Sequence, residues 1–599
     1  MNLLPTPRSL IKRPGSFQLP QEKSLWGCVI RQLRSQSAPN HPEGYALTIS
    51  KRGISVSFRE LPGLRAAQST LRQLMRESGH KLPCLEIRDW PDFARRGVML
   101  DISRGRVPKL ETLLDLAEQL AGFKINELQL YTEHTFAYRK YKRIWQSWGA
   151  LTAKEIQILD RRCRELGIDL VPNQNSFGHL RHFLEDPKLK KLGEISQPFP
   201  AETKDFLRRP TTLAPNHPGT LPFLRELYDE LLPNYSSRFF NVGGDETWDL
   251  GKGQSQQLCD AKGKGRVYLN FLKQLHREVS ARDKQMMFWG DIILKYPKLI
   301  PELAKLGRAD RPVSPAIIAL NWGYEAGHPF AWEAAQFAKA KIPFYICPGT
   351  STWQTLIGRH DNALANLRAA AQAGKKFGAI GFLNTDWGDG GHPQPLAVSW
   401  PMLAAGAALA WNARSLETKP LVAVLNRDVF LDSSGKIADA AFKLGFVHQK
   451  LGVLAPNETP LGTVIAAPQP EKRELFCRNG LKWYAKIPAA KIQAALREIE
   501  GQRKVLSRVK TKSGSAEVLA LELDLAARMA AHSCKFMLWQ QAVAAKNTIT
   551  ANQLKRQGLQ ELRKLEKDFA SYWPRRNKAT PRHCSNFLRW RIADYQAER

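Results

Sequence analysis

The chain has 599 residues, enough for more than one domain. Its 43% hydrophobic and 24% charged residues are typical of a globular protein with a large core, and no stretch is long and apolar enough to predict a membrane-spanning helix. Lys and Arg exceed Asp and Glu by 89 to 56, a net charge of +33. Because the basic residues are spread along the chain, this charge predicts a basic surface and not a nucleic-acid site.

The eight cysteines are scattered, with no CxxC pair and no metal-like spacing, which predicts free thiols in a reducing compartment. The first 15 residues include basic side chains without an apolar run after them, so a signal peptide is not expected. These observations predict a cytoplasmic protein. We also expect no metal and no cofactor, and the phosphate-binding patterns GxGxxG and GxxxxGK[ST] are absent from the sequence.

Residues 1–92 predict a small α/β domain. The segments 45–50 and 53–58 alternate apolar and polar residues, as half-buried strands do. Residues 64–78 follow with the apolar and polar faces of a helix.

Residues 93–414 repeat a pattern of strand, turn and helix. Eight such alternations predict a (β/α)8 barrel. An open doubly wound sheet is the alternative, but it would usually have fewer strands and a Gly-rich phosphate turn. The expected strands are 97–102, 126–131, 168–172, 238–242, 286–289, 316–321, 342–346 and 379–384, and helices are expected at 109–121, 153–166, 265–281, 331–340 and 361–375.

Residues 415–599 predict an α-helical C-terminal domain, with helical spacing of apolar residues at 419–431, 436–451, 488–510, 515–545 and 551–572. The densest basic run lies here, at 555–567, but acids interrupt it as on a solvated helix face. We therefore expect this region to pack against the barrel and not to bind nucleic acid.

Polar and aromatic residues gather where the barrel strands are expected to end. A lone His or Trp is more often structural, but a purely structural barrel has no need for acids and rings at one rim. Catalysis in this fold takes place at the carboxyl ends of the strands, and acids with aromatic rings are typical of a carbohydrate site. The residues are Glu133, His179, Asp245, Glu246, Trp289, Trp322, Tyr345, Trp387 and Asp389.

Asp245 and Glu246 follow Gly243 and Gly244 directly. The two glycines predict a tight turn that lets a ligand approach, with both carboxyl groups in one place. Crowding by a like charge and by Trp predicts a raised pKa, which suits a general acid. Adjacent acids are poorly spaced for the two-carboxylate mechanism, in which the groups face each other across the bond.

Several of these motifs resemble glycoside hydrolase family 20, the β-N-acetylhexosaminidases. Residues 96–104, RGVMLDISR, resemble the family's RGxMLDxxR pattern, and residues 241–246, NVGGDE, resemble its H-x-GGDE motif. Residues 172–179 are similar to its P…PGH segment, and 387–389 to its W-x-E. The first residues are similar to the α/β domain that often precedes these barrels. The resemblance covers about residues 1–412.

The resemblance implies an exo-acting, retaining hydrolase of terminal β-linked N-acetylglucosamine or N-acetylgalactosamine, in which the 2-acetamido oxygen is the nucleophile. Glu246 is then the acid and base, and Asp245 orients the acetamido group. Tyr345 is expected to bind the acetamido oxygen, and Arg96 with Asp389 the O3 and O4 hydroxyls. Trp289, Trp322 and Trp387 are expected to wall the sugar, and Glu133 with His179 to tune Glu246.

This sequence departs from the family pattern at several positions. Asn241 replaces a His, Phe177 replaces a Pro, Asp389 replaces a Glu, and residues 130–134 read LYTEH where HLTDD is common. A carbohydrate-binding protein without catalysis is therefore the alternative function. A nucleotide cyclase also carries GGDE, but there Phe follows, and here Thr247 and Trp248 follow within the eightfold pattern. The oligomeric state has no sequence signal.

Overall fold

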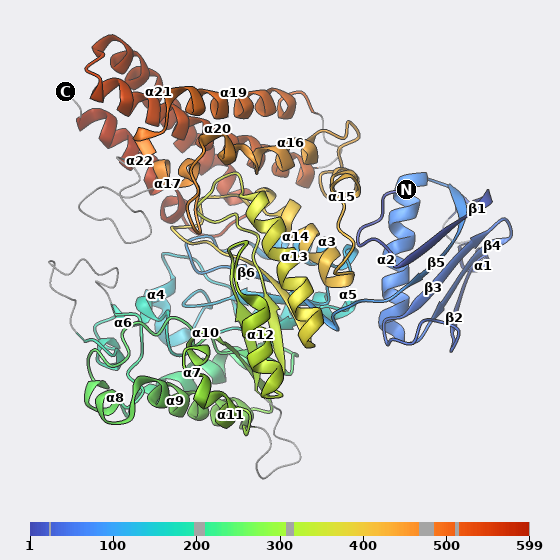
Figure 1. Ribbon diagram of the computed structural model, residues 1–599, viewed down its shortest axis with the longest axis horizontal. Helices are drawn as coiled ribbons and strands as arrows, with labels where there is room; N and C mark the ends of the chain where they lie inside the picture. The colour runs from blue at the N-terminus through green and yellow to red at the C-terminus, as the bar shows by residue number, and fades with distance from the viewer. Residues whose placement is uncertain (23–25, 197–209, 307–316, 467–483, 510–513, 598–599) are drawn as a thin grey trace.

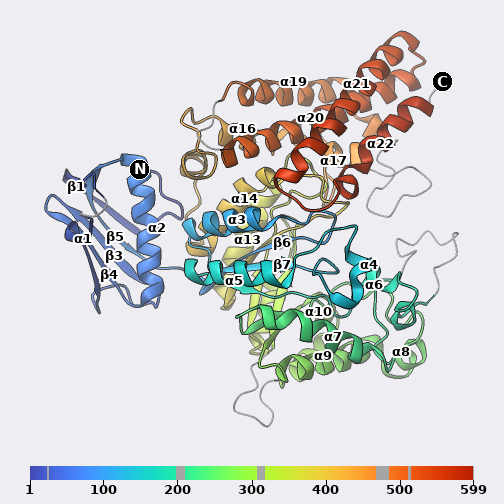
Figure 2. The same cartoon turned by 180° about the vertical axis from the view of Figure 1, so that it is seen from behind.

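The computed structural model describes residues 1–22, 26–196, 210–306, 317–466, 484–509 and 514–597. Figure 1 shows three groups of elements: a small sheet with one long helix, a central barrel, and a layer of long helices near the C-terminus. From behind, the small sheet again lies beside the barrel and the long helices lie across another side of it (Figure 2). The limits 1–92, 93–414 and 415–599 stay a prediction.

The first group is a five-stranded sheet in the order β1-β5-β3-β4-β2, with α2 packed against it. Alternate residues of β3 are buried, as its sequence pattern predicts. Its core is a separate hydrophobic cluster that also contains Trp411, from the end of the barrel. The elements are β1 (Ser9–Gln18), α1 (Trp26–Val29), β2 (Ile30–Arg34), β3 (Tyr45–Ser50), β4 (Gly53–Phe58), α2 (Leu61–Ser78) and β5 (Lys81–Asp89).

The second group is an eight-stranded parallel sheet in the order β8-β7-β6-β13-β12-β11-β10-β9. A parallel bridge between Asn173 and Asn241 joins the two ends of this order and closes the ring. The predicted (β/α)8 barrel is thereby confirmed. The strands are β6 (Arg95–Asp101), β7 (Glu127–Tyr131), β8 (Asp169–Val171), β9 (Phe239–Asn241), β10 (Gln285–Trp289), β11 (Ile318–Trp322), β12 (Phe344–Cys347) and β13 (Gly381–Asp386).

Helices connect the strands around the outside of the barrel. The five that the sequence predicts are present, and α7 lies in a stretch for which no element was expected. None of the described helices combines the length and apolarity that crossing a membrane needs. The helices are α3 (Leu110–Gly122), α5 (Ala153–Leu166), α7 (Thr220–Leu231), α9 (Lys264–Ser280), α12 (Phe330–Lys339), α13 (His360–Phe377) and α14 (Trp400–Trp411), with short helices α4 (Lys142–Trp145), α6 (Arg181–Leu184), α8 (Gln256–Lys262), α10 (Asp291–Leu294) and α11 (Ile300–Leu303).

The third group is helical, and it packs against the barrel. One hydrophobic cluster runs from the barrel helices into α16, α17, α20 and α22, and every residue of α14 is buried. Backbone hydrogen bonds from Lys109 to Arg576 and from Lys578 to Val107 stabilise the contact between this group and the barrel. The helices are α15 (Thr418–Val424), α16 (Ile437–Leu444), α17 (Pro460–Ala466), α19 (Ala489–Leu506), α20 (Gly514–Ala544), α21 (Thr548–Tyr572) and α22 (Arg582–Ala597).

The third group also reaches the carboxyl ends of the barrel strands. Trp353, in the loop after β12, donates its indole N–H to Asn457 at 2.8 Å. Trp148, in the loop after β7, stacks on His583 with ring centroids 3.6 Å apart. The C-terminal helices therefore help to hold the loops that surround the candidate site.

Candidate active site

The two glycines after β9 have backbone conformations that favour glycine. Gly243 has a φ of 71° and Gly244 a φ of 94°, so the chain turns sharply, as predicted. A Cβ on Gly243 would lie 2.2 Å from the Asn175 side chain, and one on Gly178 would lie 2.4 Å from the Asp245 carbonyl oxygen. The close approach is therefore made by the loop after β8, which packs directly on the loop after β9.

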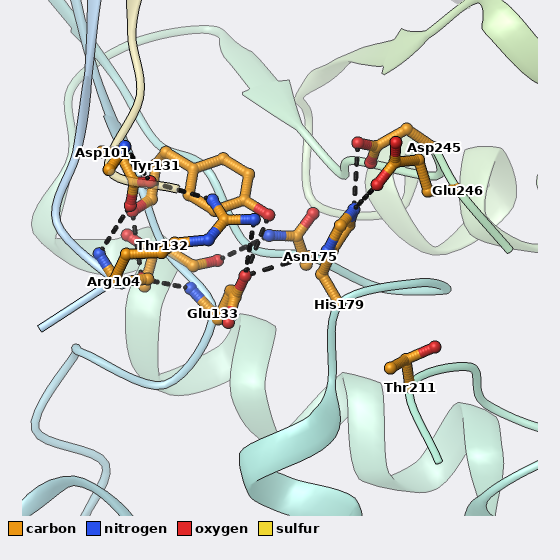
Figure 3. Close-up of polar contacts among 12 residues, drawn as sticks. Asp101, Arg104, Tyr131, Thr132, Glu133, Asn175, His179, Thr211, Asp245 and Glu246 are labelled. Atoms are coloured by element: carbon orange, nitrogen blue, oxygen red, sulfur yellow. Dashed lines mark hydrogen bonds and ion pairs between the residues drawn. The ribbon is translucent and has the colours of Figure 1, made fainter. Parts of the chain in front are cut away.

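This packing brings His179 against both acids (Figure 3). Its Nε2 lies 3.2 Å from Oδ2 of Asp245 and 3.4 Å from Oε2 of Glu246. One oxygen of each carboxyl group and a ring nitrogen of His179 lie within 4.8 Å of one another. His179 and Glu246 both have positive φ values, 58° and 45°, which residues other than glycine adopt at an energetic cost.

The charges of this group are coupled. Burial raises the pKa of Glu246 to about 8; His179 opposes the shift, while Asp245, Asp291 and Asp389 add to it. Burial alone would lower the pKa of His179, but Asp245 and then Glu246 raise it to about 9. At neutral pH the site therefore contains a protonated Glu246 and an imidazolium held by Asp245. The side chain of Glu246 is 29% exposed and that of Asp245 only 9%, so Glu246 is the more accessible acid.

A second group of charges supports His179 from the other side. Oε1 of Glu133 lies 3.9 Å from Nδ1 of His179 and 3.3 Å from Nη2 of Arg104, and it accepts a hydrogen bond from the Tyr131 hydroxyl at 3.1 Å. Arg104 also donates to Asp101 at 2.9 Å. Burial raises the pKa of Glu133, and Arg104 and His179 oppose this shift. The structure thus brings together Glu133 and His179, as the sequence predicts.

Arg96 is not part of this site, so its predicted role is wrong. Its guanidinium is buried at the start of β6, where it pairs with Glu43, in the turn before β3, at 2.5 Å and donates to the Lys124 carbonyl at 2.9 Å. The 96–104 motif contains two arginines: Arg96 lies at the start of the seven-residue strand β6 and Arg104 lies three residues beyond its end, so they lie toward opposite ends of the barrel. Arg104 is the arginine at the carboxyl end.

Tyr345 is also misplaced by the sequence prediction. It is fully buried near the start of β12, where its hydroxyl donates to Glu127 at 2.9 Å and accepts from Arg95 at 3.1 Å. Glu127 and Arg95 are the first residues of their strands, so this network lies at the amino end of the barrel. Nothing in the local sequence separates a tyrosine at the start of a strand from one that follows it.

Tyr324, which the sequence analysis did not select, lies two residues beyond β11, on the side of the acids. Its ring stacks on Trp322 at 5.1 Å and meets Trp353 edge-on at 5.1 Å. Burial raises its pKa, hydrogen bonding to Thr385 lowers it, and Asp245 is close enough to raise it further. The Trp-Gly-Tyr sequence at the end of a predicted strand is the signal that could have identified this residue.

The predicted tryptophans and Asp389 do come together at this end. Trp387 lies 4.7 Å from the Tyr131 ring and 6.0 Å from Trp289, and Trp322 packs against the same aromatic cluster. Burial raises the pKa of Asp389, and Arg104 is the group that opposes this shift most. The result is an aromatic wall with acids on one side and Arg104 with Asp389 on another, which is chemically suited to a sugar ring.

Asp291 is a further acid at this end of the barrel, to which the sequence analysis gave no role. It begins α10, two residues beyond β10. Burial raises its pKa to about 7, Asp245 adds to the shift, and Lys295 opposes it. Asp291 therefore contributes to the negative potential that keeps Glu246 protonated.

Comparison with known proteins agrees with this geometry. Residues 93–308 match the family model for the catalytic domain of glycosyl hydrolase family 20, and residues 22–90 match domain 2 of the same family. The chain is 24% identical over 297 residues to a β-hexosaminidase of Porphyromonas gingivalis (43% of this chain, 36% of that one). It is 27% identical over 241 residues to a β-N-acetylhexosaminidase of Cellulomonas fimi (36% and 47%). The matched part thus spans less than half the length of these relatives.

Solved structures share the fold. The chitobiase of Flavobacterium johnsoniae superposes with a TM-score of 0.55 at 17% identity, covering 93% of this chain and 96% of that one. A β-N-acetylhexosaminidase of Bacteroides fragilis superposes with a TM-score of 0.52 at 18% identity (70% and 92%). Both family models match in this order along the chain, and the barrel closes as described, so residues 22–90 and 93–308 correspond to the two domains of glycosyl hydrolase family 20.

Proposed function

We propose that this chain hydrolyses terminal β-linked N-acetylhexosamine with retention of configuration, using the substrate's acetamido group as nucleophile. The observation that carries the proposal is that Asp245 and Glu246 both contact the same nitrogen of His179. Relatives named β-hexosaminidase support the substrate class, and a family 20 enzyme of Vibrio harveyi was solved in complex with N-acetylglucosamine.

The arrangement of the acids around one histidine supports this mechanism over the two-carboxylate one. Oxygens of Asp245 and Glu246 come within 4.8 Å of each other and of His179. Carboxyl groups that flank a glycosidic bond stand about 5–5.5 Å apart in retaining enzymes and about 6.5–9.5 Å apart in inverting ones. Since these two acids are neighbours in the chain and share one histidine, they approach a substrate from the same side and act on different groups of one sugar.

In the first step, the acetamido oxygen forms a bond to the anomeric carbon as the bond to the aglycone oxygen breaks. Glu246, protonated at neutral pH because its pKa is about 8, donates its proton to the leaving oxygen. Asp245 accepts a hydrogen bond from the acetamido N–H and stabilises the positive charge of the oxazolinium ring. In the second step, water attacks the anomeric carbon, its proton returns to Glu246, and the acetamido group is regenerated.

The surrounding residues position these groups. His179 holds the Asp245 carboxylate, with Glu133 behind it. Arg104 and Asp389 bind sugar hydroxyls, a role that the sequence motif suggested for Arg96. Tyr324 takes the role of donor to the acetamido oxygen.

A panel of p-nitrophenyl glycosides tests the proposal. The wild-type chain should release p-nitrophenol from the β-N-acetylglucosaminide or the β-N-acetylgalactosaminide and not from the β-glucoside, which lacks the internal nucleophile. Glu246→Gln should lower kcat by at least about 10²-fold, the usual contribution of a general acid. Binding of N-acetylglucosamine without release from any 2-acetamido substrate would contradict the proposal and favour a sugar-binding protein.

A further inference from the structure

A second cluster of ligating side chains lies beside the candidate active site. Ligand atoms of Glu133, His134 and His182 all lie within 4.8 Å of one another. Glu133 and His134 follow β7, and His182 lies in α6, three residues beyond His179. The fold therefore brings together two imidazoles and a carboxylate that are distant in the chain.

His134 is unusual because it is completely buried and yet unsatisfied. Its exposed fraction is 0%, and neither Nδ1 nor Nε2 has a hydrogen-bond partner among the described residues. Buried polar side chains nearly always have such a partner, and an exception calls for a bound ion or water. The rings of His134 and His182 have centroids 3.9 Å apart, so an ion that binds His134 lies within reach of His182.

The three side chains are of the types that bind a divalent cation in proteins. A metal binds the imidazole nitrogens of two histidines and the oxygen of a carboxylate, which are the ligand atoms that His134, His182 and Glu133 place within 4.8 Å of one another.

Rigid aromatic packing encloses the cluster. The Trp148 ring lies 4.6 Å from His182 and meets His134 edge-on at 5.3 Å. His583, from α22, stacks on the Trp148 ring, and its Nε2 donates a hydrogen bond to the Ser147 carbonyl oxygen at 3.1 Å. An apolar shell of this kind limits solvent access and fixes the orientation of the ligands.

We propose that Glu133, His134 and His182 bind a divalent transition-metal ion of the zinc class, through one carboxylate oxygen and two ring nitrogens. Three N and O ligands of this kind are typical for Zn²⁺, with a fourth position open to water. Tyr131, Arg104 and His179 all contact the same oxygen of Glu133, Oε1, and a carboxylate can use its two oxygens for different partners. The ion and the catalytic network thus share Glu133.

Titration of the full-length chain tests the site independently of hydrolysis. The protein is stripped with a chelator, dialysed and titrated with Co²⁺, whose visible absorption reports low-coordinate N and O ligation; Zn²⁺ binding is then measured by calorimetry. We expect one equivalent of either ion to bind. His182→Gln should weaken binding at least about tenfold, since even the loss of a group that only supports a ligand has that effect.

His328→Gln is the matched control, because His328 also sits beside a carboxylate, Glu333, at 2.7 Å and is only partly exposed. It should leave the affinity unchanged. Glu246→Gln separates this cluster from the group formed by His179, Asp245 and Glu246, and it should also leave binding intact. Absence of saturable binding by the wild type, or loss of binding in Glu246→Gln with retention in His182→Gln, would overturn the proposal. If His182→Gln does not fold, diffraction from wild-type crystals at the zinc edge decides the question by the position of the anomalous peak.

Discussion

His179 Nε2 lies 3.2 Å from Oδ2 of Asp245, and Nδ1 of the same ring faces Glu133. The imidazolium therefore joins a carboxylate that contacts the substrate in the proposed mechanism to one that lies behind it. If His179 positions Asp245, then His179→Gln should lower kcat by about 10²-fold, the usual effect of misplacing a catalytic group by about an ångström. Steady-state kinetics on the 2-acetamido substrate measures this. An unchanged kcat would show that Asp245 does not depend on His179.

The same contact predicts how stability depends on pH. The pKa of His179 rises from 6.5 to about 9 on folding, so its contribution to the free energy of unfolding is complete below pH 6.5 and is lost as the pH rises through about 9. Denaturant titrations of the wild type should show a fall in stability across this range. The fall should be smaller for His179→Gln, whose side chain does not titrate.

The raised pKa of Glu246 should set the alkaline limit of activity. It must keep its proton to act as an acid, so kcat/KM should fall as the pH rises through about 8. Asp291 is one of the acids that raise this pKa, so Asp291→Asn should move the alkaline limb to lower pH. Asp260→Asn removes the same charge from the exposed surface of α8 and serves as the control. Identical profiles for all three proteins would contradict the electrostatic role of Asp291.

Substitutions of the two arginines in the 96–104 motif should have different effects, one on stability and the other on catalysis. Arg96→Gln leaves Glu43 buried without its partner, which should destabilise the fold by about 3–5 kcal/mol without raising KM. Arg104→Gln removes a group that is proposed to bind sugar hydroxyls and should lower kcat/KM by at least about 10²-fold. Urea unfolding and kinetics on both variants measure the two effects. A rise in KM for Arg96→Gln would restore the role that the motif suggested.

Substitutions of Tyr324 and Tyr345 should differ in the same way, one affecting catalysis and the other stability. Tyr324→Phe should lower kcat on 2-acetamido substrates about tenfold, because one hydrogen bond to the acetamido oxygen is lost. Tyr345→Phe removes a donor to buried Glu127 and should lower stability by about 1–3 kcal/mol with kcat unchanged. Thermal melting and kinetics together distinguish these outcomes, and a kinetic defect confined to Tyr345→Phe would contradict the assignment.

Much of the barrel could be predicted because its strands are short apolar runs separated by amphipathic helices, and each run has a physical reason to be buried. Helix α7 also buries one face, but the sequence analysis named no helix in the long segment between the expected strands 168–172 and 238–242. The Asp245–Glu246 pair was found because the two acids follow an expected barrel strand, at the end of the barrel where catalytic residues lie. Arg96 was misassigned because the family motif was followed although Arg96 precedes the expected strand 97–102. Tyr345 was misassigned because the expected strand 342–346 begins and ends earlier than β12 (Phe344–Cys347), which placed Tyr345 too close to the carboxyl end.

The residues that the sequence analysis missed share a different cause. Tyr324, Asp291 and His134 each follow a strand by a few residues, and their environment is built by loops from other strands. Arg104 was quoted within a motif but given no role, for the same reason. Such environments depend on closure of the barrel, which places distant loops side by side, and no local pattern encodes it.

The position of Trp411 has a structural consequence. This residue ends α14 and lies inside the core of the N-terminal sheet, where its indole N–H donates to Asp89 at 2.9 Å. Asp92, just before β6, accepts from the backbone of Ala413 at 2.9 Å. β6 and β13, the first and last strands of the barrel, pair with each other. The N-terminal domain therefore contacts the chain beside both strands and stabilises their pairing. A protein engineer who replaced the N-terminal domain would therefore also remove contacts that stabilise the closed barrel.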